Sequence, residues 1–115
     1  MLESAEQRIL VRWMESKGFF FFSVPNEAAS SAKKTNQLKK MGLSPGAPDL
    51  VIVTRPPARK ACVVCIELKR AKGGRVSTVQ KAWHKRAEEN GFIVYVCYGA
   101  KDAIHKLCLL YGLVP

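Results

Sequence analysis

Two carboxylates and a lysine stand at the ends of two apolar runs of this sequence. The run CVVCIELK ends in Glu67 and Lys69, and the run DLVIV begins at Asp49. Charge buried at such positions is costly unless it is paired or bound to a metal. Carboxylates bind Mg²⁺, which also takes phosphate oxygens, and the cation lowers the pKa of a bound water molecule. A lysine beside that water can orient or deprotonate it, so the three side chains indicate metal-assisted hydrolysis at phosphorus.

The predicted strands bring these side chains to one edge of a sheet. Residues 49–54 and 61–69 are both rich in β-branched and apolar residues, and only the turn RPPAR separates them. So short a link predicts an antiparallel pair, in which the start of one strand lies beside the end of the next. Side chains alternate along a strand, so Glu67 and Lys69 share a face with Asp49 nearby. An ordinary salt bridge of Lys69 with either carboxylate would explain the same spacing, and spacing alone leaves both explanations open.

The remaining elements complete one α/β domain over residues 1–115. The predicted order is α-β-β-β-α-β-α, with a mixed central sheet flanked by helices. Ser4 is the expected N-cap of the first helix, and Ser77 caps the second, whose buried stripe holds Val79, Trp83 and Ala87. The other expected elements are helices at 4–17, 77–90 and 102–112 and strands at 19–24 and 92–98.

Positive charge dominates the composition. The 115 residues include 19 lysines and arginines against 9 acidic residues, which gives a net charge of +10. That excess favours a polyanionic partner, nucleic acid first, although plain solubility is the alternative explanation. Residues 26–48 are polar and basic and are expected to form a long mobile loop. Phosphates are expected to meet basic residues on both sides of the site: Lys33, Lys34, Lys39 and Lys40 before Asp49, and Arg70, Lys72 and Arg75 after Lys69.

Other features of the sequence argue against a membrane protein, a secreted protein and a zinc-binding protein. No stretch is long and apolar enough to span a bilayer, and the polar, acidic start MLESAEQR is unlike a signal peptide, so a cytoplasmic location is expected. The four cysteines lack a second C-x-x-C or a histidine pair and are expected to be buried free thiols rather than zinc ligands. His84 and His105 are expected to be ordinary helix-surface or packing residues.

The sequence resembles a nuclease family. Pro48-Asp49 followed by Glu67-Leu68-Lys69, on an αβββαβ core, resembles the PD-(D/E)XK nuclease superfamily. Within it, GAPDLVIV, IELKR, the glycine turn, S-x-x-Q and the tryptophan resemble the VRR-NUC (virus-type replication-repair nuclease) branch over most of the chain. This resemblance implies metal binding by Asp49, Glu67 and the carbonyl of Leu68, with Lys69 as the catalytic lysine.

The resemblance also implies roles for two helical residues. Gln80 would point into the same pocket, although Ser77-x-x-Gln80 is also a capping box, and the two readings are compatible. A glutamate of the first helix would reach the metal. Glu3 has the family spacing, whereas Glu6 becomes the competitor if Ser4 is the N-cap.

The function that the resemblance implies is a Mg²⁺-dependent endodeoxyribonuclease, with Mn²⁺ able to substitute. Stand-alone phage and bacterial members cut four-way (Holliday) junctions as homodimers, so branched DNA and a second copy are the expected partners. FFFF (19–22) and LLYGLVP (109–115) are candidate dimer surfaces, and packing into the core is the alternative for both. Alternatives are a nuclease for flaps, nicks or plain duplex and a non-catalytic DNA-binding module.

Overall fold

The computed structural model describes residues 3–25, 32–60 and 62–114, with side chains of the second helix from residue 36 onward. Its elements lie in the order expected for an αβββαβ core, with two further helices. They are α1 (Glu3–Ser16), β1 (Phe21–Ser23), α2 (Ala32–Lys40), β2 (Leu50–Ile52), β3 (Val64–Lys69), α3 (Thr78–Glu89), β4 (Ile93–Tyr98) and α4 (Ala100–Tyr111).

The four strands form one mixed sheet in the order β1-β2-β3-β4. β1 pairs with β2 and β2 with β3 in antiparallel fashion, and helix α2 lies in the long connection between β1 and β2. β4 returns parallel to β3 because helix α3 carries the chain back along the sheet. The fold class predicted from the sequence is confirmed.

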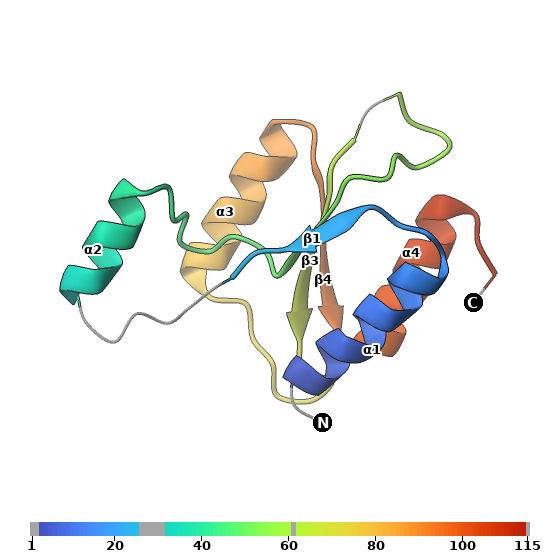
Figure 1. The fold of residues 1–115 in the computed structure, drawn as a ribbon, viewed down its shortest axis with the longest axis horizontal. Coiled ribbons are helices and arrows are strands. Elements are labelled where there is room, and N and C mark those ends of the chain that lie inside the picture. The colour runs from blue at the N-terminus through green and yellow to red at the C-terminus, as the bar shows by residue number, and fades with distance from the viewer. Residues whose placement is uncertain (1–2, 26–31, 61, 115) are drawn as a thin grey trace.

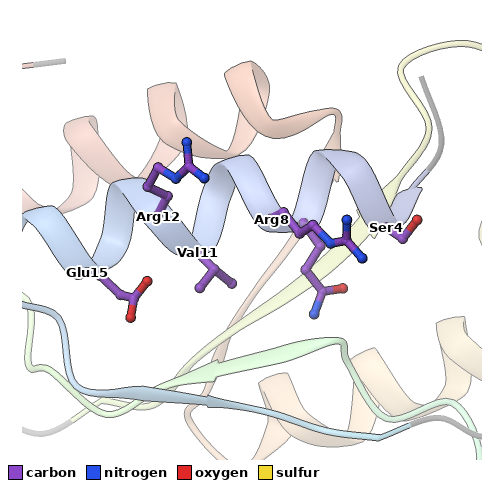
Figure 2. A pocket seen from close by; sticks show the side chains of 6 residues that line it. Ser4, Arg8, Val11, Arg12 and Glu15 are labelled. Atoms are coloured by element: carbon purple, nitrogen blue, oxygen red, sulfur yellow. The ribbon is translucent and has the colours of Figure 1, made fainter.

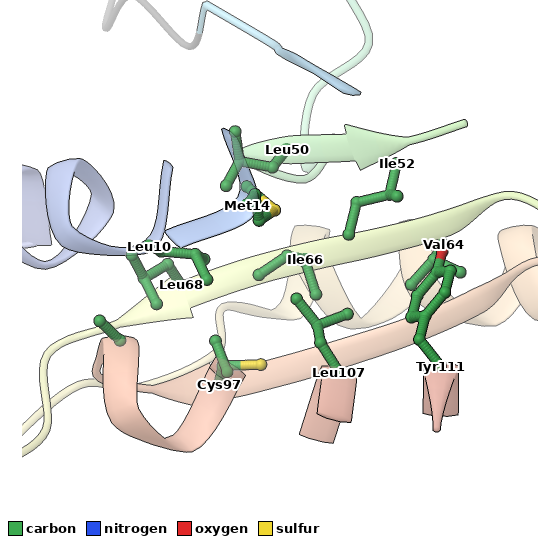
Figure 3. Close-up of a cluster of buried hydrophobic side chains, with 12 residues drawn as sticks. Leu10, Met14, Leu50, Ile52, Val64, Ile66, Leu68, Cys97, Leu107 and Tyr111 are labelled. Carbon is green, nitrogen blue, oxygen red and sulfur yellow. The ribbon is translucent and has the colours of Figure 1, made fainter. Parts of the chain in front are cut away.

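The hydrophobic core lies between the sheet and the pair of helices α1 and α4, while α3 covers the opposite face (Figure 1). Val64, Ile66 and Leu68 of β3 point into this core, where they meet Leu10 of α1 and Leu107 of α4 (Figure 3). Because side chains alternate along a strand, the residues between them, Cys65, Glu67 and Lys69, turn toward α3. Burial of one face thereby fixes the orientation of the polar residues on the other.

Helix α2 lies within the segment 26–48 that was expected to be a loop. Its sequence AKKTNQLKK consists largely of good helix formers, but it has almost no apolar stripe. Among the described residues it contacts no other helix or strand, and it projects away from the sheet (Figure 1). Residues 26–31 and the side chains of Lys33 and Lys34 lie outside the described parts, and the mobility of the segment stays a prediction.

Several local expectations are corrected. α1 already includes Glu3, so Ser4 lies inside its first turn and is not the N-cap. Glutamates there suit the positive end of the helix dipole. Of the predicted buried stripe of α3, Ala87 is buried, Trp83 is half-buried and Val79 is exposed, because His84 turns inward in place of Val79. The capping box of Ser77 with Gln80 is present as predicted.

The structure also shows the state of the cysteines and the lengths of the helices. All four cysteines are free, and Cys65, Cys97 and Cys108 are buried whereas Cys62 is half-buried. Over the described ranges, no helix has the length and apolar character needed to cross a membrane.

Candidate active site

The antiparallel pairing of β2 and β3 brings Asp49 beside Glu67. The Asp49 main-chain N–H donates to the carbonyl of Ile66 at 3.0 Å. In return the N–H of Leu68 donates to Oδ2 of Asp49 at 2.6 Å, which holds this carboxylate against the end of β3. Glu67 is almost fully buried next to it, with 3% of its side chain exposed. The sequence-predicted neighbours are therefore neighbours in the structure.

Burial and a like charge perturb Glu67 strongly. Desolvation raises the pKa of Glu67 to about 8, helped by the negative charge of Asp49 and a side-chain hydrogen bond with it. Lys69 opposes this shift, and Glu3 adds to it. Near neutral pH the folded protein therefore keeps a proton on Glu67. A cation that replaces the proton would relieve the same repulsion.

Lys69 and Gln80 complete this cluster from two elements. The Lys69 ammonium donates to Oε1 of Gln80 at 2.9 Å and lies 3.8 Å from Oε2 of Glu67. The same Gln80 oxygen accepts the main-chain N–H of Ser77 at 2.9 Å. Gln80 therefore both caps α3 and contacts the site lysine, so the two readings of this residue hold together.

The main-chain carbonyl of Leu68 faces the same side as Asp49. The N–H and C=O groups of one strand residue point the same way, and those of the next residue point oppositely. The Leu68 N–H points to Asp49, whereas the Lys69 carbonyl accepts the N–H of Gly99 at 2.9 Å on the β4 side. An oxygen ligand at Leu68 would therefore lie beside the carboxylate pair.

The two candidate glutamates of α1 have different surroundings. Glu6 Oε2 accepts the N–H of Ala100, at the start of α4, where the N-cap Gly99 has no side chain to do so. Glu3 is exposed, and its charge contributes to the raised pKa of Glu67. The geometry therefore gives Glu6 a capping contact and leaves Glu3 near the carboxylate pair.

These contacts predict opposite behaviour for the two glutamates. Glu6→Ala is expected to lower the free energy of unfolding by about 1 kcal/mol, because a helix cap is lost, without changing Mn²⁺ affinity. Glu3→Ala is expected to weaken Mn²⁺ binding about 10-fold at unchanged stability. Thermal unfolding and Mn²⁺ titration of both variants check this. Weaker Mn²⁺ binding by the Glu6 variant and not by the Glu3 variant would reverse the assignment.

The loop that delivers Asp49 is held against α3. The Trp83 indole N–H donates to Oγ of Ser44 at 2.9 Å, so this half-buried tryptophan fixes the loop. Gly46 has a φ of +86°, and a Cβ there would lie 2.6 Å from the carbonyl oxygen of Val79. Only glycine suits both the backbone and the close approach.

Gly46→Ala is therefore expected to destabilise the protein more than Gly42→Ala. Gly42 also has a positive φ, but a Cβ there meets no atom within 4 Å, so it controls for backbone strain alone. The difference should be about 1–3 kcal/mol, because the clash at Gly46 is with main-chain atoms of α3. Chemical denaturation of both variants measures it. Equal losses would show that the close approach carries no cost.

Asp49 and Glu67 fit a hard divalent cation. Within the described ranges, no three or more His, Cys, Asp or Glu side chains form a complete metal cage. Mg²⁺ does not require one, since it commonly binds one or two carboxylates, waters and substrate phosphates. The Glu67 carboxyl group is buried beside Asp49 and has a raised pKa, as expected of a carboxylate that a bound cation would stabilise.

Comparison with known proteins decides the family. The family model described as the VRR-NUC domain matches residues 1–101. The chain belongs to the VRR-NUC family. A solved structure titled "VRR_NUC domain protein" superposes with a TM-score of 0.82 at 20% identity, covering 98% of this chain and 90% of the other. A second, titled "VRR_NUC domain", has a TM-score of 0.63 at 22% identity and covers 95% and 96%. No curated protein matches the sequence.

One buried histidine of this VRR-NUC domain was not expected near the site. His84 is 7% exposed, and its Nε2 lies 3.7 Å from Oε1 of Glu67. Burial lowers the pKa of His84, Glu88 opposes that shift, and Lys69 adds to it. A signal was present in the sequence, since Gln80 and His84 are four residues apart and share one face of a helix.

The basic residues of this VRR-NUC domain that were expected to contact phosphates lie in two separate places. Arg70, Lys72 and Arg75 are exposed on the turn after Lys69. This turn folds back onto the site, since a Cβ at Gly74 would lie 2.8 Å from Cβ of Lys69. Lys39 and Lys40 are exposed at the end of α2, which stands apart from the sheet (Figure 1). The structure therefore places Arg70, Lys72 and Arg75 beside the site, whereas Lys39 and Lys40 lie apart from it.

A groove along α1 contains two arginines, Arg8 and Arg12, that were not among the predicted DNA-binding residues. It measures about 510 Å³, and Figure 2 shows the side chains along it. Arg8 and Arg12 are exposed one turn apart, and the groove begins at Ser4, next to Glu3. No sequence pattern distinguishes these two arginines from the basic residues that are commonly exposed on a helix.

Proposed function

We propose that this VRR-NUC chain is a Mg²⁺-dependent endonuclease that cuts branched DNA. Family membership already indicates a nuclease with DNA as its substrate. The observation that supports metal-dependent hydrolysis is the half-buried Asp49 beside the buried Glu67, with the Lys69 ammonium 3.8 Å from Oε2 of Glu67.

In this proposal Asp49, Glu67 and the carbonyl of Leu68 hold the cation, and Glu3 reaches it from α1. The cation, Mg²⁺ or Mn²⁺, would acidify a water molecule and stabilise negative charge on the phosphoryl oxygens. Lys69 orients the attacking water and stabilises the developing charge, and Gln80 holds the ammonium through its 2.9 Å hydrogen bond.

The proposed grip on DNA follows the charge around this site. Arg70, Lys72 and Arg75 lie on the turn that folds over Lys69, where they would contact phosphates next to the scissile one. Arg8 and Arg12 would extend that contact along α1, and the lysines of α2 would reach a more distant part of the substrate.

A homodimer would supply the second site that a four-way junction needs. Two sites related by a twofold axis can cut opposed strands of a junction. Phe20 and Phe22 are 68% and 51% exposed beside and on the edge strand β1, and Leu109 and Val114 are 74% and 81% exposed at the chain's end. Such apolar side chains are suited to an interface between copies. Sedimentation showing only monomer at micromolar concentration would remove the dimer from the proposal.

A cleavage panel tests the function. Labelled four-way junction, flap, nicked duplex and linear duplex of matched sequence are incubated with the protein in Mg²⁺ and in EDTA. The proposal expects cleavage of the junction above all, and only with Mg²⁺. Cleavage of flaps, nicks or duplex in preference to the junction would keep the nuclease and discard the junction. Binding without cleavage in either Mg²⁺ or Mn²⁺ would instead favour a binding module.

A further inference from the structure

His84 and Glu67 face each other across the contact between α3 and β3. Four residues on a helix advance about 6 Å, and two residues on a strand advance about 6.6 Å. Gln80 and His84 therefore match the spacing of Lys69 and Glu67, with Gln80 against Lys69 and His84 against Glu67. One face of α3 therefore contacts both Lys69 and Glu67 of β3.

The His84–Glu67 contact lacks a direct hydrogen bond. Oε1 of Glu67 and Nε2 of His84 are both buried and have no hydrogen-bond partner among the residues that the structure describes, and they lie 3.7 Å apart. That distance is too long for a direct hydrogen bond. Buried polar atoms are almost always satisfied, so these two are expected to satisfy each other through a small ring rotation or one shared water molecule. An imidazole ring has at least one N–H that can serve as the donor.

We propose that His84 is a positioning residue for Glu67. The His84 Nε2–H donates to Oε1 of Glu67, directly or through one water, and fixes the carboxylate so that Oε2 stays beside Lys69. This inference rests on the proposed metal-binding role of Glu67, and it assigns His84 no contact with DNA or the cation. A hard cation prefers oxygen ligands, which is why the imidazole is placed behind the carboxylate and not on the metal.

The test compares His84→Gln with His84→Leu in the full chain. Glutamine keeps a side-chain N–H donor, whereas leucine fills similar space without one. Mn²⁺ affinity is measured without DNA from the EPR signal of free Mn²⁺, and thermal unfolding checks that each variant is folded. His105→Ala, at an exposed histidine of α4, is the matched control.

The leucine variant is expected to bind Mn²⁺ about 10–100-fold more weakly than wild type, as is typical when a residue that orients a metal ligand is lost. The glutamine variant should stay within about threefold of wild type, and the His105 variant should be unchanged. Equal affinity of the leucine variant and wild type would overturn the positioning role. So would equally weak binding by glutamine and leucine, which would point to the imidazole as a ligand. If wild type itself bound no Mn²⁺, the proposed metal centre would fail first, and this inference with it.

Discussion

Replacing Lys69 by alanine is expected to slow DNA cleavage by about 10²–10⁴-fold, the range found when a group that moves or orients a proton is removed. The ammonium lies 3.8 Å from Glu67 Oε2 and is held by Gln80 at 2.9 Å, so it acts at one fixed point of the site. DNA affinity should change by less than about threefold, since only one of many positive charges is lost. Lys69 is 9% exposed and therefore contributes little to the surface that meets phosphates.

The measurement is single-turnover cleavage in Mg²⁺ together with DNA binding in Ca²⁺. Lys72→Ala is the matched control, because Lys72 is exposed on the following turn. The Lys72 variant is expected to bind DNA more weakly and to cleave bound DNA at the wild-type rate. A Lys69→Ala enzyme that cleaves bound DNA at the wild-type rate would leave this lysine with only the salt-bridge role.

Replacing Glu67 by glutamine is expected to abolish function while stabilising the metal-free protein. The pKa of Glu67 rises in the folded state from the ordinary value of 4.5 to about 8. Between these values the unfolded chain has released the proton that the folded protein keeps, so the wild type loses stability as the pH rises from about 4.5 to about 8. Glutamine cannot ionise, so its stability should not fall over this window. The gain at pH 8 is expected to be roughly 4 kcal/mol, since a change of one pKa unit corresponds to about 1.4 kcal/mol.

Thermal unfolding of metal-free protein at pH 5 and pH 8 measures this difference. Glu89→Gln, at an exposed position near the end of α3, is the matched control and should follow the wild type at both pH values. Added Mg²⁺ should stabilise wild type at pH 8 but not the Glu67 variant, and cleavage should fall by about 100-fold or more in that variant. A Glu67→Gln protein that is less stable than wild type at pH 8 would contradict the raised pKa.

The parts of this site that follow from local rules could be predicted from the sequence. The alternation along 61–69 places Glu67 and Lys69 on one face, and the short link expected before it predicted the antiparallel pairing that brings Asp49 near them, although the observed link runs from residue 53 to residue 63. The capping box around Gln80 is also local. These features depend only on strand geometry, turn length and one helix start.

The parts that depend on how elements dock could not be predicted in the same way. The buried stripe of α3 was predicted only in part: Ala87 is buried as expected, but Val79 is exposed and His84 lies against Glu67. The contact of Glu6 with the N–H of Ala100 joins residues 94 apart in the chain, and no local pattern reports it. Helix α2 was missed because it has almost no apolar stripe, the signal by which helices are recognised in a sequence.

The most direct measurement of the central claim is cleavage of a labelled four-way junction by wild type and by Asp49→Asn, with Mg²⁺ and with EDTA. The account predicts that wild type cuts only with Mg²⁺ and that the Asp49 variant binds the junction without cutting it. Cleavage by wild type in EDTA, or by the Asp49 variant at the wild-type rate, would contradict a metal-dependent centre built on Asp49, Glu67 and Lys69.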